Sequence, residues 1–145
     1  MYEATKKYLS QIQRMNRKIE NKAAEAEQLR SMISNVSSVK FDKVNVQTTP
    51  EQDKIGTAVS KIVDLENETS ALVDELLAKR ATIIEQIDSL DDVVFYHILS
   101  RRYVGGQDMN KIAREMGYTE RHIRNVTNKA LKAFETKYGH LYIRR

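Results

Sequence analysis

Cysteine is absent from this chain of 145 residues, which also holds no tryptophan, one proline and five glycines. Without cysteine there can be neither a disulfide framework nor a thiolate metal site. The scarcity of proline and glycine, beside 41% hydrophobic and 30% charged residues, favours a mainly helical protein. The histidines are scattered and form no ligand set at helical spacing: His97, His122 and His140.

Long apolar runs are missing as well. No stretch approaches the roughly 20 apolar residues of a membrane span, and the N-terminus lacks the apolar core of a signal peptide. We therefore expect a cytoplasmic protein without membrane contact. The chain is long enough for one or two small domains with a modest core.

Positive charge is concentrated at one end of the chain. Residues 1–100 hold 13 Lys and Arg against 16 Asp and Glu, a net charge of −3, whereas residues 101–145 hold 11 against 4, a net charge of +7. An excess confined to one end indicates a local anionic partner rather than general solubility.

Two long amphipathic helices are predicted in residues 1–90. From Tyr2 to about Ser34, apolar residues recur at gaps of three and four, with Lys22 at one position of this seam. The first seam consists of Tyr8, Ile12, Met15, Ile19, Ala26, Leu29 and Ile33. The second consists of Ile55, Ala58, Ile62, Leu65, Thr69, Leu72, Leu76, Ile83, Ile87 and Leu90. Such narrow stripes must pair, either within one chain as a hairpin or between two copies.

The start of the second helix and the connection before it are marked in the sequence. Thr49 can cap, Pro50 suits the first helical position, and Gln52 completes a capping box. The preceding connection, Asn35–Thr49, is long for a helical hairpin. Val39, Phe41, Val44 and Val46 in it are β-prone, so a short strand and a disordered tip both remain open.

Residues 108–131 follow the pattern of a helix-turn-helix. Asp108 caps the first helix, Gly117 forms the turn, and Thr119 caps a second helix running to about Tyr138. Small Ala113 lies where the two helices cross. The apolar residues expected between them are Ile112, Met116, Tyr118, Ile123 and Val126.

A further helix precedes this motif, and a short tail follows it. Ser89 or Asp91 can cap a helix that extends to Tyr103 and ends at the two glycines that follow. The tail after Gly139 carries Leu141, Tyr142 and Ile143, which can fold back onto the domain. The predicted fold is therefore all-α, with a helical hairpin or coiled-coil arm (1–90) and a C-terminal helix-turn-helix domain (91–145).

Four segments of the C-terminal part carry a resemblance to a known family. They are Arg101-Arg102-Tyr103, Ile112-Ala113, Gly117-Tyr118 and the helix from Thr119 through Lys129-Ala130-Leu131. Together they resemble region 4, the promoter-reading part of bacterial sigma-70 factors. With the long N-terminal helices, the chain resembles sigma-like regulators of phages and prophages of Gram-positive bacteria, some of which activate late operons. The resemblance implies a cytoplasmic transcriptional regulator in a bacterial host cell, with RNA polymerase as a candidate partner.

The chain departs from the sigma pattern at the start of the second helix. Sigma factors place Arg-Glu-Arg after the capping residue, and this chain has Glu120-Arg121-His122. We therefore expect a target other than the upstream hexamer that sigma factors read. No second sigma region is visible.

Sequence-specific binding to double-stranded DNA is the function that we expect, with the second helix of the motif in the major groove. The expected base-contacting residues are Glu120, Arg121, His122, Arg124, Asn125 and Asn128. The expected phosphate-contacting residues are Arg101, Arg102, Lys111, Arg114, Thr119, Lys129 and Lys132. A homodimer is expected, because two linked readers gain affinity together.

Two other functions remain open from the sequence. One is a DNA-packaging adaptor of the small-terminase kind, which also joins a helix-turn-helix to an oligomerising helical region. The other is a protein-interaction module in which the motif serves as a docking fold. The acidic groups Asp91-Asp92 and Asp64, Glu66 and Glu68 lack an accompanying histidine or pocket, so we expect no enzyme, metal or cofactor.

Overall fold

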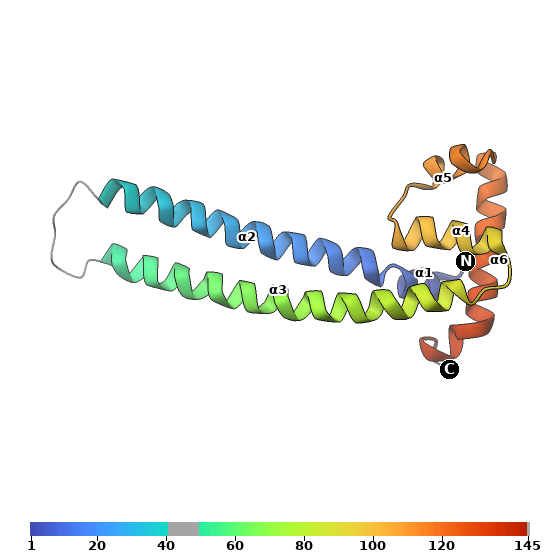
Figure 1. Cartoon of the computed structure of the whole chain (residues 1–145), viewed down its shortest axis with the longest axis horizontal. Helices are drawn as coiled ribbons and strands as arrows, with labels where there is room; N and C mark the ends of the chain where they lie inside the picture. The colour runs from blue at the N-terminus through green and yellow to red at the C-terminus, as the bar shows by residue number, and fades with distance from the viewer. Residues whose placement is uncertain (41–49, 145) are drawn as a thin grey trace. The chain divides into compact units, whose positions relative to one another are not determined.

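The computed structural model describes residues 1–40 and 50–144 and contains only helical elements there (Figure 1). This confirms the all-α fold class. The helices are α1 (Glu3–Leu9), α2 (Gln11–Lys40), α3 (Pro50–Asp88), α4 (Val93–Leu99), α5 (Met109–Met116) and α6 (Glu120–Tyr138). A π-helical turn (Ser100–Val104) follows α4, and a 3-10 turn (Gly139–Leu141) follows α6.

The chain forms two compact units. One comprises residues 16–75, and the other combines residues 1–15 with residues 76–145. We call them the arm unit and the terminal unit. Among the described residues, no helix combines the length and the apolar composition that crossing a membrane requires.

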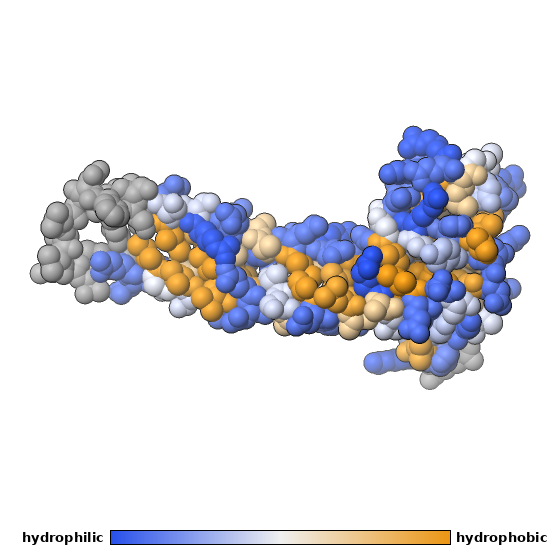
Figure 2. All heavy atoms as spheres, in the orientation of Figure 1, coloured by the Kyte–Doolittle hydropathy of each residue, from blue (hydrophilic) through white to orange (hydrophobic). Residues whose placement is uncertain are grey.

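The arm unit consists of parts of α2 and α3, which lie side by side (Figure 1). Ala26 on α2 and Leu65 on α3 are buried, and hydrophobic residues form a band along the two helices (Figure 2). Lys22, the polar residue of the first seam, forms an ion pair with Glu68, their charged atoms 2.6 Å apart. Arg30 of α2 also forms an ion pair with Glu66 of α3. Apolar burial along one stripe and ion pairs beside it thus hold the two helices together.

The boundaries of α1 and α2 differ from the predicted single helix from Tyr2 to about Ser34. The helix is interrupted at Ser10, and α2 continues beyond Ser34 to Lys40. The predicted connection Asn35–Thr49 is therefore wrong in its first residues, which are helical. Its remaining part, 41–49, including the β-prone Phe41, Val44 and Val46, lies outside the described residues. The second helix begins at Pro50 as predicted.

The terminal unit is built around α6, whose Phe134 and Leu131 are fully buried. Helix α1 packs on α6: the Thr5 hydroxyl donates to a Glu135 carboxylate oxygen at 2.8 Å. Thr5 also shares a 2.8 Å hydrogen bond with the Tyr142 hydroxyl, and the Tyr8 ring stacks on the Tyr142 ring with centroids 4.4 Å apart. The tail therefore folds back, as predicted from the sequence, and it does so against the first helix.

The cap of α4 is Asp92, which is neither of the two predicted candidates, Ser89 and Asp91. The Asp92 side chain accepts from the backbone N–H groups of Val94 and Phe95, so neither Ser89 nor Asp91 is the N-cap. The Ser89 hydroxyl instead hydrogen-bonds to the Gln86 carbonyl and the Tyr138 hydroxyl. Asp92 has the extended backbone that a capping residue requires, which explains the preference.

Candidate nucleic-acid interface

Three residues fix the start of α5 and the tight turn that joins α5 to α6. The Asp108 side chain accepts from the Asn110 N–H at the start of α5. Gly117 has φ 72°, and the N–H of Tyr118 donates to the Ala113 carbonyl at 2.8 Å, which closes the end of α5. The Thr119 hydroxyl accepts from the His122 N–H at 3.1 Å and starts α6. Glycine is required at position 117 because other residues rarely adopt a positive φ.

An apolar cluster beneath the turn fixes which side of α6 faces inward. Ile98 of α4, Ile112 and Ala113 of α5, and Ile123 and Val126 of α6 are all buried in this cluster. Met116 and Tyr118, also predicted from the sequence, pack against it while partly exposed. With this side buried, the opposite side of α6 faces solvent.

The outward side of α6 carries several of the predicted base-contacting residues. Arg121 and Asn125 are exposed, and Asn128 is half-buried one turn further on. These three positions recur at gaps of four and three, so they share one face of the helix. Lys129 and Lys132 extend the same polar side and are exposed.

Glu120, His122 and Arg124 are also exposed, at the borders of this face. The His122 ring lies edge-on to Tyr118 with centroids 4.5 Å apart, which restrains its position near the turn. Glu120 lies in the first turn of α6, where a carboxylate interacts favourably with the helix dipole.

The predicted phosphate-contacting residues differ in whether they already interact with other groups of the protein. Lys111 and Arg114 are exposed on α5. Arg101 forms an ion pair with Glu115, with a guanidinium nitrogen 2.7 Å from the carboxylate oxygen. Arg102 donates to the backbone carbonyl of Gln107 at 3.0 Å, so no carboxylate among the described residues neutralises its charge. The Thr119 hydroxyl accepts as a cap and keeps its own proton for donation.

Lys6 and Tyr103 were not predicted from the sequence as site residues. Lys6 of α1 and Tyr103 of the π-helical turn line one cleft together with the predicted residues Arg102, Arg124 and Asn128. Burial raises the pKa of the Tyr103 phenol above its ordinary value, so the group is a neutral hydrogen-bond donor at physiological pH. The sequence signal that could have indicated this site is the Lys6-Lys7 pair within a helix otherwise predicted only for its apolar seam.

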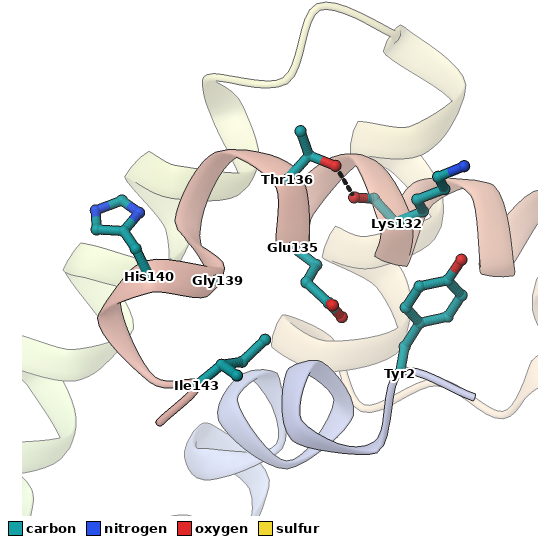
Figure 3. Close-up of a pocket in the computed structure, with 7 residues that line it drawn as sticks. All are labelled: Tyr2, Lys132, Glu135, Thr136, Gly139, His140 and Ile143. Carbon is teal, nitrogen blue, oxygen red and sulfur yellow. Dashed lines mark hydrogen bonds between the residues drawn. The ribbon is translucent and has the colours of Figure 1, made fainter. Parts of the chain in front are cut away.

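Lys132 lies farther along α6 and lines a different cavity, of about 700 Å³ (Figure 3). The Glu135 side chain faces this space together with Tyr2 and Ile143, whereas the His140 ring points away from it (Figure 3). Because a carboxylate and a lysine both line it, this cavity offers an anion less net attraction than the outward side of α6 does.

Comparison with models of known protein families, with curated protein sequences and with solved structures gives no significant match.

Proposed function

We propose that this chain is a sequence-specific DNA-binding transcriptional regulator of the sigma region 4-like type found in phages and prophages. In this proposal α6 enters the major groove, while α5 and the π-helical turn after α4 contact the DNA backbone. The observation that carries the proposal is the outward side of α6. There Arg121, Asn125 and Asn128 share one face of a capped helix whose other face is buried.

The residue types on this face suit the reading of base edges. Arginine donates two parallel hydrogen bonds to guanine, and asparagine can both donate to and accept from adenine. Lys129 on α6, together with Lys111 and Arg114 on α5, supplies exposed positive charge for phosphates on either side of the groove. The net charge of +7 in residues 101–145 favours a polyanionic partner.

Self-association and a contact with RNA polymerase belong to the same proposal. A homodimer is supported by apolar residues that stay exposed on α3 of the arm unit, among them Val59 and Val63. The resemblance to sigma factors makes RNA polymerase a candidate partner.

Selection of binding sites from random duplex DNA by the full-length protein tests the proposal. We expect a defined motif for the wild type and an altered motif for Arg121→Ala, at a cost of roughly 1–3 kcal/mol on the original site. Lys129→Ala should weaken all sequences alike, because a phosphate contact carries no base information. Lys61→Ala on the arm unit is the matched control and should leave both affinity and motif unchanged.

The absence of any selected motif in the wild type would contradict sequence-specific binding. Tight wild-type binding with an unchanged motif in Arg121→Ala would show that α6 does not read the bases. A mass of about eight to ten subunits in solution would favour a packaging adaptor over a regulator.

A further inference from the structure

The terminal unit contains a cleft of about 510 Å³ beside the first half of α6. Four elements contribute to its walls: α1, the π-helical turn, α5 and α6. Its lining residues are Met1, Lys6, Arg102, Tyr103, Met109, Arg124, Thr127 and Asn128. Three of these side chains are cationic and none is a carboxylate, which separates this cleft from the mixed-charge cavity of Figure 3.

The positive charge of this cleft is poorly compensated within the described part of the chain. Arg124 forms no ion pair or side-chain hydrogen bond there, and Arg102 bonds only to the neutral carbonyl of Gln107. Lys6 is paired with Glu3, but the two charged atoms are 3.6 Å apart and Glu3 is largely exposed to solvent. Three nearby cations with one weak counter-charge attract an anion into the space between them.

Tyr103 adds a phenol donor to the cleft. The residue is only 8% exposed, and its hydroxyl has no hydrogen-bond partner among residues 1–40 and 50–144, yet this oxygen is not closed off from solvent as the unpaired Gln107 Oε1 is. The phenol can therefore donate to an acceptor that replaces water in the cleft. The Asn128 amide can donate beside it, whereas the Thr127 hydroxyl already donates to the Ile123 carbonyl at 2.6 Å. The donors and the cations match the tetrahedral oxygens of a phosphate group.

We propose that this cleft binds a backbone phosphate of the DNA, at the edge of the major groove that α6 enters. The inference rests on the proposed function. It adds α1 and the π-helical turn to the interface, through Lys6, Arg102 and Tyr103. Arg124 and Asn128 belong both to the cleft and to the outward side of α6, so a phosphate held here lies next to the bases. The same chemistry would accept free phosphate, which the experiment distinguishes.

The test measures the affinity of the full-length protein for duplex DNA as a function of salt concentration. We expect Lys6→Gln to reduce the slope of log K against log salt by about 0.9, the loss of one phosphate contact. Lys7→Gln, which removes the same charge at the next position but outside this cleft, should leave the slope unchanged. Tyr103→Phe keeps the buried ring and should weaken binding to every sequence by roughly tenfold.

Two outcomes of this test would contradict phosphate binding in the cleft without contradicting the proposed function. One is equal loss of slope in Lys6→Gln and Lys7→Gln, which would reflect general charge. The other is unchanged binding in both Lys6→Gln and Tyr103→Phe. Thermal unfolding of each variant, followed by circular dichroism, verifies that a loss of affinity is not a loss of fold.

A wild type that binds no DNA would contradict the proposed function and the DNA phosphate together. Titration with inorganic pyrophosphate, followed by the backbone amide NMR signals of residues 102–103 and 124–128, then decides whether an anion site exists. Saturable shifts that disappear in Lys6→Gln would identify a site for a free phosphate compound. Absence of such shifts would remove the site altogether.

Discussion

Lys22 is a charged residue at a position of the heptad pattern that is usually apolar. It occupies a seam position on α2, where an apolar side chain is expected, yet its amino group reaches Glu68 of α3 at 2.6 Å. The aliphatic stem of a lysine can cover apolar surface while its charge stays near water. A polar residue at one seam position often fixes the register of two helices at some cost in stability. Lys22 and Glu68 are suited to this role.

The pKa of Glu68 provides a test of this pair. The hydrogen bond from Lys22 and its charge lower the pKa of the Glu68 carboxyl below its ordinary value. The pair therefore stabilises the fold above the unfolded pKa of about 4.3, and this contribution is lost as the pH falls through the lowered folded pKa. We expect Lys22→Met to return the Glu68 pKa to its ordinary range, as measured by NMR titration of the side-chain carboxyl.

Lys54→Met, on the solvent-exposed side of α3, serves as the control and should leave the Glu68 titration unchanged. A Glu68 pKa that is equal in wild type and Lys22→Met would show that the two side chains do not pair in solution.

At the scale of the element, two glycines occupy opposite kinds of position. Gly117 ends α5 with φ 72°, and a Cβ there would meet no atom within 4 Å, so only the backbone conformation demands glycine. Gly56 lies inside α3 and also has open space around it, but without a positive φ. Gly117 is therefore required for the end of α5, whereas Gly56 destabilises α3.

We expect the two alanine substitutions to change stability in opposite directions. Gly117→Ala should lower the free energy of unfolding by about 1–2 kcal/mol, the cost of a left-handed residue with a Cβ. Gly56→Ala should raise it by up to about 1 kcal/mol, because alanine is the better helix former. Urea denaturation of both variants measures the difference. A neutral Gly117→Ala would mean that α5 ends differently in solution.

The elements of the α5–α6 region could be predicted because their signals are local. A cap, a turn glycine and the following cap lie within residues 108–119, and the structure places each in that role. The π-helical turn after α4 could not be predicted, because nothing in Ser100–Val104 distinguishes it from a continuing α-helix. The cap of α4 was misplaced because Asp91 and Asp92 are both suitable, and only the backbone angles choose between them.

At the scale of the whole molecule, contacts between residues far apart in the chain could not be predicted from the sequence. Thr5 and Glu135 are 130 residues apart, and no periodicity indicates that they meet. The cleft residues Lys6, Tyr103 and Arg124 come from three separate elements for the same reason. By contrast, the exposed side of α6 follows from the 3.6-residue repeat alone, which is why its residues could be chosen from the sequence.

Exposed apolar residues of the arm unit lead us to expect that the protein self-associates. Val59 and Val63 on α3 are 47% and 49% exposed, and covering the exposed half of such a side chain is worth roughly 1 kcal/mol. We expect the wild type to sediment as a dimer at tens of micromolar and Val63→Asp to shift towards monomer with its helicity retained. Lys61→Asp, two residues away and also exposed, is the control for charge. A monomeric wild type would exclude the dimer at that concentration.

The hydrogen bond between Thr5 and Tyr142 has a consequence for the order in which the protein can be assembled during translation. A nascent chain is made from its N-terminus, and these two residues are separated by 137 positions. The ion pair between Lys22 and Glu68 can form when about half of the chain has emerged, whereas α1 must wait for α6 and the tail. Until then α1, whose Leu9 is fully buried in the finished protein, lacks its contact with α6. The newly made protein thus carries exposed apolar surface at its first helix until synthesis is nearly finished.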